Sequence, residues 1–191
     1  MTELAARRRL DPDARRTEIL DAALRLYAER PYGEVSTTEL AREAGVARAL
    51  LNHYFGTKRA LYLEALRELL TIPEQAATDL AGQRPDDRAG AAVDWFLDTV
   101  EDRRSLWLSV GIGLSGDPEV DAVVEDADET AVDRVLTALG RDACDEPLRA
   151  RVRAFFGMVR AASREWLVRG SLDRPAVRKL LTTAFVTVLE D

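Results

Sequence analysis

Residues 36–58 read STTELAREAGVARALLNHYFGTK, and this stretch predicts two short helices joined by a sharp turn. Ser36 followed by Glu39 has the spacing of a capping box, in which the serine hydroxyl accepts from the Glu39 backbone N–H and the carboxylate reaches back to Ser36. Gly45 supplies the backbone conformation that a tight turn requires. We therefore expect a capped helix of about two turns, a glycine turn and a second short helix.

The second of these helices has two unlike faces. On a helical wheel, apolar side chains cover one half of residues 46–55, and the other half carries Arg48, Ala49, Asn52 and His53. An ordinary surface helix can have this pattern. The setting favours a helix-turn-helix, because the lengths of the two helices and of the turn fit that motif. There the second helix turns its polar face toward the major groove, where arginine and asparagine can read base edges.

Phosphate contacts are expected at two helix starts. Thr37 and Thr38 lie in the first turn of the capped helix, and Lys58 follows Thr57, the predicted N-cap of the next helix. Hydroxyl, ammonium and free backbone N–H groups at such positions form anion sites.

The remaining pattern predicts an all-α protein, with almost no strand signal. Apolar spacing predicts a helix over residues 13–30, ended by Pro31 and Gly33. Residues 81–90 are predicted to form a loop, because they combine glycine, proline and charge without an apolar period. Further helical segments are predicted over residues 57–71, 93–100, 105–116 (continuous or broken), 117–140, 145–170 and 173–188.

Charge is distributed unevenly over the 191 residues. The net charge is −7, but residues 1–60 carry 11 Lys and Arg against 9 Asp and Glu, whereas residues 61–191 carry 16 against 25. Arg7, Arg8 and Arg9 form a basic cluster, which is either an arm that follows a polyanion or a solvated tail. The acidic balance alone therefore does not exclude a nucleic-acid partner.

Composition argues against several other classes of protein. A single cysteine, Cys144, and the lack of a leader-like start favour the cytoplasm. The longest nearly apolar run, residues 106–115, is about half the roughly 20 residues of a membrane-spanning helix, and no basic amphipathic helix supports a membrane-surface role. One histidine and one cysteine form no metal site or nucleophile–base pair, so we expect no enzyme, cofactor or metal. The stronger rival is a helical protein–protein interaction module without DNA binding.

Residues 15–66 resemble the N-terminal DNA-binding domain of TetR-type (TetR/AcrR) transcriptional regulators. The first helix, the STTELAREAGV segment, HYF and Lys58 all appear in register. The resemblance implies an all-α fold, with a three-helix helix-turn-helix DNA-binding domain over residues 1–60 (1–12 a basic arm) and a helical effector-binding and dimerisation domain over residues 61–191. It also implies a homodimer on a palindromic DNA operator, acting as a ligand-responsive repressor that a small-molecule effector releases from DNA.

The outward-facing pattern and the resemblance together predict a set of DNA-contacting residues. These are Thr37, Thr38, Arg48, Ala49, Asn52, His53, Tyr54 and Lys58. Leu51 and Phe55 are assigned to the core. Ala47, Leu50 and Asn52 depart from residues common in the family, so the preferred base sequence stays open. Leu50 either touches a thymine methyl group or packs against the preceding capped helix.

An effector pocket in the second domain is implied by the family alone. Candidate lining residues are Leu66, Trp95, Trp107, Phe155 and Met158, with Arg103 and Ser109 as polar anchors, and plain core packing is the alternative for each. The acidic second domain disfavours an anionic effector, although one arginine in the pocket would overturn that expectation.

The last two predicted helices are expected to be antiparallel neighbours with wide apolar stripes. Each stripe belongs either to the core or to a partner. In the family, the corresponding helices pair with their copies in a dimer, which places two recognition helices roughly 34–36 Å apart. The candidate interface residues are Trp166, Leu181, Phe185 and Val188.

Overall fold

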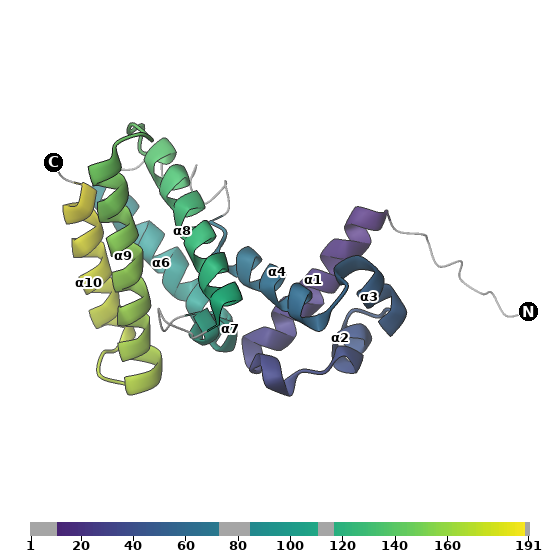
Figure 1. The fold of residues 1–191 in the computed structure, drawn as a ribbon. Helices are drawn as coiled ribbons and strands as arrows, with labels where there is room; N and C mark the ends of the chain where they lie inside the picture. Colours follow the sequence, from purple (N-terminus) through teal and green to yellow (C-terminus); the bar gives the residue numbers. More distant parts are fainter. Residues whose placement is uncertain (1–10, 73–84, 111–116, 190–191) are drawn as a thin grey trace, which may run out of the picture.

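The computed structural model describes residues 11–72, 85–110 and 117–189, and every regular element in these ranges is helical (Figure 1). The all-α prediction is confirmed. The basic cluster at residues 7–9 lies outside the described residues. The described helices are α1 (Pro12–Glu29), α2 (Thr37–Glu43), α3 (Arg48–Phe55), α4 (Lys58–Leu70), α6 (Pro85–Asp102), α7 (Arg104–Val110), α8 (Pro118–Ala138), α9 (Glu146–Arg164) and α10 (Arg174–Leu189).

Two predicted segments differ from the structure. Residues 85–90, expected to be part of a loop, form the first turns of α6, because proline is tolerated at a helix start and Asp87 is exposed to solvent. The predicted single helix over residues 145–170 is α9 followed by a π-helical turn, Glu165–Arg169, which Gly170 ends in the left-handed conformation. Of the segment predicted over residues 105–116, the structure describes α7 as far as Val110.

The helices form two adjoining bodies (Figure 1). Helices α1, α2 and α3 pack together with the start of α4, while α10 packs against α6 and α9, and α8 packs against α9. The final two helices are neighbours, as expected. Helix α4 contacts α1 and α3 in the first body and α7 and α8 in the second, so it connects the two. Within the described residues, no helix is long and apolar enough to cross a membrane.

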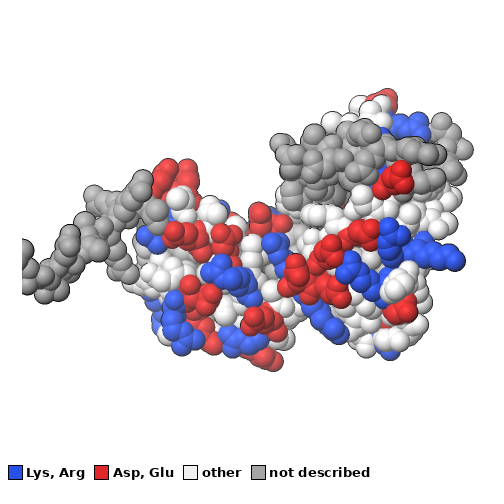
Figure 2. Space-filling model, turned by 180° about the vertical axis from the view of Figure 1, so that it is seen from behind, with Lys and Arg blue, Asp and Glu red and all other residues white. Residues whose placement is uncertain are grey.

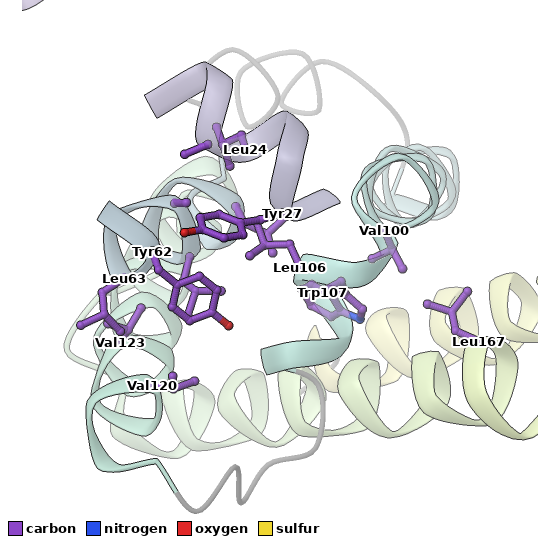
Figure 3. Packing of buried hydrophobic residues seen from close by; sticks show 14 of the residues in the cluster. Leu24, Tyr27, Tyr62, Leu63, Val100, Leu106, Trp107, Val120, Val123 and Leu167 are labelled. Atoms are coloured by element: carbon purple, nitrogen blue, oxygen red, sulfur yellow. The ribbon is translucent and has the colours of Figure 1, made fainter. Parts of the chain in front are cut away.

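One hydrophobic core continues across this junction (Figure 3). Tyr27 of α1 meets Tyr62 of α4 edge to face, with ring centroids 5.1 Å apart. Leu106 and Trp107 of α7 and Val120 of α8 belong to the same buried cluster. The orientation of the first body is therefore set by packing against the second as well as by the chain connection.

Candidate nucleic-acid interface

The start of α2 is fixed by the predicted capping box. The Glu39 backbone N–H donates to Ser36 Oγ at 3.2 Å, and the Ser36 backbone N–H donates to Glu39 Oε2 at 2.9 Å. Arg30, which follows α1, donates to the other Glu39 oxygen at 3.0 Å. The Ser36 side chain and backbone, together with Arg30, lower the pKa of Glu39 to about 2. The carboxylate therefore stays ionised and ties α2 to the end of α1.

The turn between α2 and α3 is a Schellman motif. Gly45 has a φ of +63°, a region that disfavours residues with a Cβ atom. The Val46 N–H donates to the Ala41 carbonyl at 2.9 Å, and the Gly45 N–H donates to the Arg42 carbonyl at 3.1 Å. These two bonds satisfy carbonyls at the end of α2 and fix the direction in which α3 leaves.

Helix α3 buries one face and exposes the other. Leu51 has no exposed surface and Phe55 is 6% exposed, as expected for core residues. Arg48, Ala49, Asn52 and His53 are exposed, and Tyr54 is half-buried against the core. Among the described residues, the Arg48 and Asn52 side chains make no hydrogen bond or ion pair. This polar face is therefore available to a partner.

Arg48 differs in this respect from most of the described arginines. Carboxylates pair with arginines on both bodies, as in Arg25–Glu43 at 3.1 Å and Arg178–Asp94 at 2.6 Å. On the face shown in Figure 2, acidic and basic side chains are interspersed over both bodies. The described part of that face therefore shows no large patch of a single charge sign that would mark a binding site. Among the described residues, α3 thus exposes an arginine whose charge no carboxylate neutralises.

The predicted phosphate-contacting residues lie at the helix starts, but Lys58 has an internal role as well. Thr37 and Thr38 occupy the first turn of α2, and Thr38 is exposed. The Lys58 ammonium donates to the Tyr32 carbonyl at 2.6 Å and lies 4.0 Å from the Tyr32 ring centroid. Burial lowers the Lys58 pKa. Lys58 therefore holds the short 3-10 helix Tyr32–Glu34 against the start of α4, a contact that the sequence pattern did not reveal.

The second body contains an apolar cavity of about 310 Å³ between α4, α6, α8, α9 and α10. Three of the predicted lining residues, Trp95, Trp107 and Phe155, do line it. The cavity wall also includes residues that sequence reasoning missed. Among them are Phe96, Phe156, Val159, Phe185 and the charged residues Arg88, Asp128, Arg134 and Arg160.

The other four predicted lining residues lie elsewhere. Leu66 is fully buried in the core away from the cavity wall. Arg103 lines a separate hollow beside α1, and the Ser109 hydroxyl donates to the Leu106 carbonyl within α7 at 2.6 Å. Met158 is 41% exposed on the outside of α9. Helical spacing places a residue on a face, but it does not tell which neighbour covers that face.

For two of the four predicted dimer residues, the burial supports the alternative of core packing. Leu181 has no exposed surface and Phe185 is 8% exposed, and both line the cavity, so they belong to the interior of the protomer. Trp166 and Val188 are half-buried against the same core. The exposed large apolar residues of the last two helices and the turn between them are instead Met158, Val168 and Leu180.

Comparison with known proteins assigns the family. Residues 19–65 match the family described as bacterial regulatory proteins, tetR family, and residues 85–188 match the tetracyclin repressor-like C-terminal domain. The chain belongs to the TetR family. This TetR-family regulator is thus a DNA-binding transcriptional regulator with a helix-turn-helix, and it is not an enzyme. Its C-terminal domain is of a kind that typically binds ligands and forms dimers.

Two relatives and one solved structure show how far the similarity extends. The chain is 33% identical over 175 residues to the HTH-type transcriptional activator FasR of Mycolicibacterium smegmatis, covering 87% of this chain and 77% of FasR. It is 48% identical over 56 residues to the regulator BetI of Agrobacterium fabrum, covering 29% and 27% of the two chains. A tetR-family regulator from Streptomyces coelicolor shares the fold, with a TM-score of 0.73 at 22% identity, covering 94% and 82%.

Proposed function

We propose that this TetR-family regulator binds a near-palindromic DNA operator as a homodimer, with the exposed face of α3 in the major groove. The observation that carries the proposal is the pair Arg48 and Asn52, which are exposed on α3 and have no side-chain partner among the described residues. Arginine bonds guanine and asparagine bonds adenine through two hydrogen bonds each, so this pair suits direct base contact. Ala49, His53 and Tyr54 flank these side chains, and Thr37, Thr38 and Lys58 supply phosphate contacts.

The homodimer is proposed to form through the outer faces of α9 and α10 (Figure 1). One side of α9 is exposed and carries mostly small or apolar residues, namely Ala154, Gly157, Met158 and Ala161, and Val168 and Leu180 extend the exposed apolar surface. A Cβ atom built on Gly157 would meet nothing within 4 Å, so the surface there is open. Small residues let two helices approach closely, and a two-fold contact would repeat the same surface on both copies.

The second domain is proposed to be the regulatory one. The division into a DNA-binding domain over residues 1–60 and an effector and dimerisation domain over residues 61–191 is supported by the separate family matches. A small molecule in the cavity would change operator affinity by favouring one arrangement of α4, a coupling on the order of 1–3 kcal/mol. Repression is the expected direction. The name of the relative FasR favours activation as the second candidate.

Selection of genomic DNA fragments by the purified protein tests this proposal. We expect footprints on a near-palindrome with half-sites about one helical turn apart, and affinity that falls steeply with salt because phosphate contacts release counterions. The double variant Arg48→Ala, Asn52→Ala is compared in the same selection and should no longer enrich these DNA fragments. Failure to enrich any fragment, or enrichment that the double variant retains, would refute the assignment of α3 and favour a protein-binding module. A reporter carrying the recovered fragment then separates repression from activation.

A further inference from the structure

The cavity of the second body has an apolar wall with charged residues set into it. Asp128 and Arg160 face each other in a two-pronged ion pair, with both nitrogen–oxygen distances at 2.8 Å, so their charges compensate. Arg88 and Arg134 also line the cavity. Because Asp128 is the only acidic residue among these described lining residues, the charge of the wall is positive, although the domain as a whole is acidic.

Arg134 is a cation of this wall whose described partner is a backbone carbonyl. It is half-buried on α8, and its Nη1 donates to the backbone carbonyl of Ile72, just beyond the end of α4. Among the described residues, no carboxylate pairs with it. A guanidinium has five N–H donors, and a neutral carbonyl does not cancel its charge. Arg134 can therefore bind a planar anion by donating two parallel hydrogen bonds to it.

The rest of the wall suits an apolar group. The aromatic side chains that line the cavity include Trp107, which meets Phe96 edge to face with centroids 5.1 Å apart, and Phe155, whose ring centroid lies 5.0 Å from that of Phe185. These contacts hold the rings in place around a volume of about 310 Å³. That volume is at the lower end of the roughly 300–1,000 Å³ of small-molecule pockets. The space therefore fits a small apolar body.

We propose that the effector is an amphipathic carboxylate, with its apolar body between the aromatic rings and its carboxylate on Arg134. The inference rests on the proposed effector function and names the chemistry of the ligand. The acidic second domain disfavours an anionic effector, and an arginine in the pocket is the exception that the sequence analysis allowed. Net charge acts over the Debye length, about 8 Å in physiological salt, whereas a guanidinium–carboxylate pair is a local, directional contact.

The same arginine links the ligand to the DNA-binding body. Arg134 holds the carbonyl of Ile72, and α4 ends at Leu70 and begins at Lys58, directly after the helix-turn-helix. A carboxylate bound to both Nη groups of Arg134 shares this guanidinium with the Ile72 carbonyl. Ligand binding thus changes a contact at one end of α4, and the other end of α4 lies beside α3.

Calorimetric titration of the full-length protein tests the proposal with three probes that share one alkyl chain: decanoate, decan-1-ol and decyltrimethylammonium. We expect decanoate to bind roughly tenfold or more tightly than decan-1-ol, the factor typical of a hydrogen bond to a charged group. Decyltrimethylammonium should bind most weakly. Arg134→Gln should abolish the preference for decanoate and leave decan-1-ol affinity within about twofold. Arg169→Gln, which removes an exposed arginine outside the cavity, should retain the preference.

The outcomes separate this inference from the effector function itself. Equal affinities for decanoate and decan-1-ol in the unaltered protein would overturn the carboxylate assignment and leave an apolar effector site standing. Binding of none of the three probes by a protein that still binds its selected DNA would overturn the inference and remove the support for an effector in this cavity. Should Arg134→Gln fold poorly, the comparison of head groups on the unaltered protein decides, and Arg134→Lys should retain part of the preference.

Discussion

Arg59 of α4 and Asp117, the N-cap of α8, form an ion pair that joins the two bodies. Arg59 Nη2 donates to both Asp117 carboxylate oxygens, each at 2.5 Å, and Arg59 Nε donates to Glu119 at 2.9 Å. The guanidinium also lies 5.6 Å from the Tyr62 ring centroid. The start of α4 is therefore attached to the start of α8, the helix that also carries Arg134.

A double-mutant cycle measures what the Arg59–Glu119 contact contributes to this attachment. Arg59→Gln and Glu119→Gln remove the two charges without removing the Asp117 cap of α8. Side-chain exposure is 25% for Arg59 and 63% for Glu119, so we expect a coupling free energy of only about 0.5 kcal/mol, smaller at high salt. Urea unfolding of the four proteins provides the values. If the stability loss of the double variant equals the sum of the losses of the two single variants, the Arg59–Glu119 contact contributes nothing measurable.

Acid should weaken the start of α2. The folded-state pKa of Glu39, about 2, is below its ordinary value of 4.5, so the carboxylate contributes stability above pH 4.5 that is lost as the pH falls toward 2. Thermal unfolding between pH 6 and pH 2.5 checks this expectation. Glu39→Gln keeps a capping side chain but cannot titrate, so its melting temperature should fall less than that of the unaltered protein over this range. If the melting temperatures of the two proteins fell equally with pH, the assignment of this acid sensitivity to Glu39 would be wrong.

Arg48→Ala tests base contact separately from phosphate contact. Because the side chain is exposed and unpaired among the described residues, its removal should leave thermal stability within about 0.5 kcal/mol. At one position of the operator, the difference in binding free energy between the preferred base pair and the others should decrease by about 1–3 kcal/mol. Binding to a set of single-base operator variants measures this. A uniform loss over the whole set would show that Arg48 contacts phosphate instead.

Lys58→Gln should affect both folding and DNA binding. Loss of the ammonium over the Tyr32 ring should lower the free energy of unfolding by roughly 0.5–1 kcal/mol. Loss of a phosphate contact should weaken binding to all DNA sequences alike. It should also reduce the slope of the logarithm of affinity against the logarithm of salt concentration by about one. Filter binding at several salt concentrations gives the slope. An unchanged slope with lowered stability would assign Lys58 to the Tyr32 contact alone.

Replacement of Gly157 by a charged residue should prevent dimerisation. Gly157→Glu has room in the protomer, since a Cβ atom at this position would have no neighbour within 4 Å, but it would bury an unpaired carboxylate between two copies. We expect a folded monomer in analytical ultracentrifugation, with weakened operator binding. Glu125→Gln, at an exposed site of α8, is the matched control and should stay dimeric. A dimeric Gly157→Glu protein would place the interface elsewhere.

Local patterns predicted local structure well. Ser36, Glu39 and Gly45 act through bonds within a few residues, and the structure contains the capping box and the turn that their spacing indicates. The contrast between Leu51 inside and Arg48 outside follows from helical period alone.

Residues whose position depends on tertiary packing were predicted less well. Leu181 and Leu180 are adjacent and equally apolar, yet the first is buried and the second is 44% exposed. Which of them faces the interior is decided by how α6 and α9 pack against α10, and a single helix does not contain that information. The bond from Arg134 to Ile72 joins residues that are 62 positions apart, so no local pattern could reveal it.

The core shared by Tyr27, Tyr62 and Trp107 limits how this regulator can be divided. A fragment that stops after residue 72 would keep Tyr62 but lose the α7 and α8 side chains that cover it. The fresh apolar surface would favour self-association of such a fragment. The helix-turn-helix is therefore expected to unfold together with the rest of the chain in one cooperative step, and not as a detachable module.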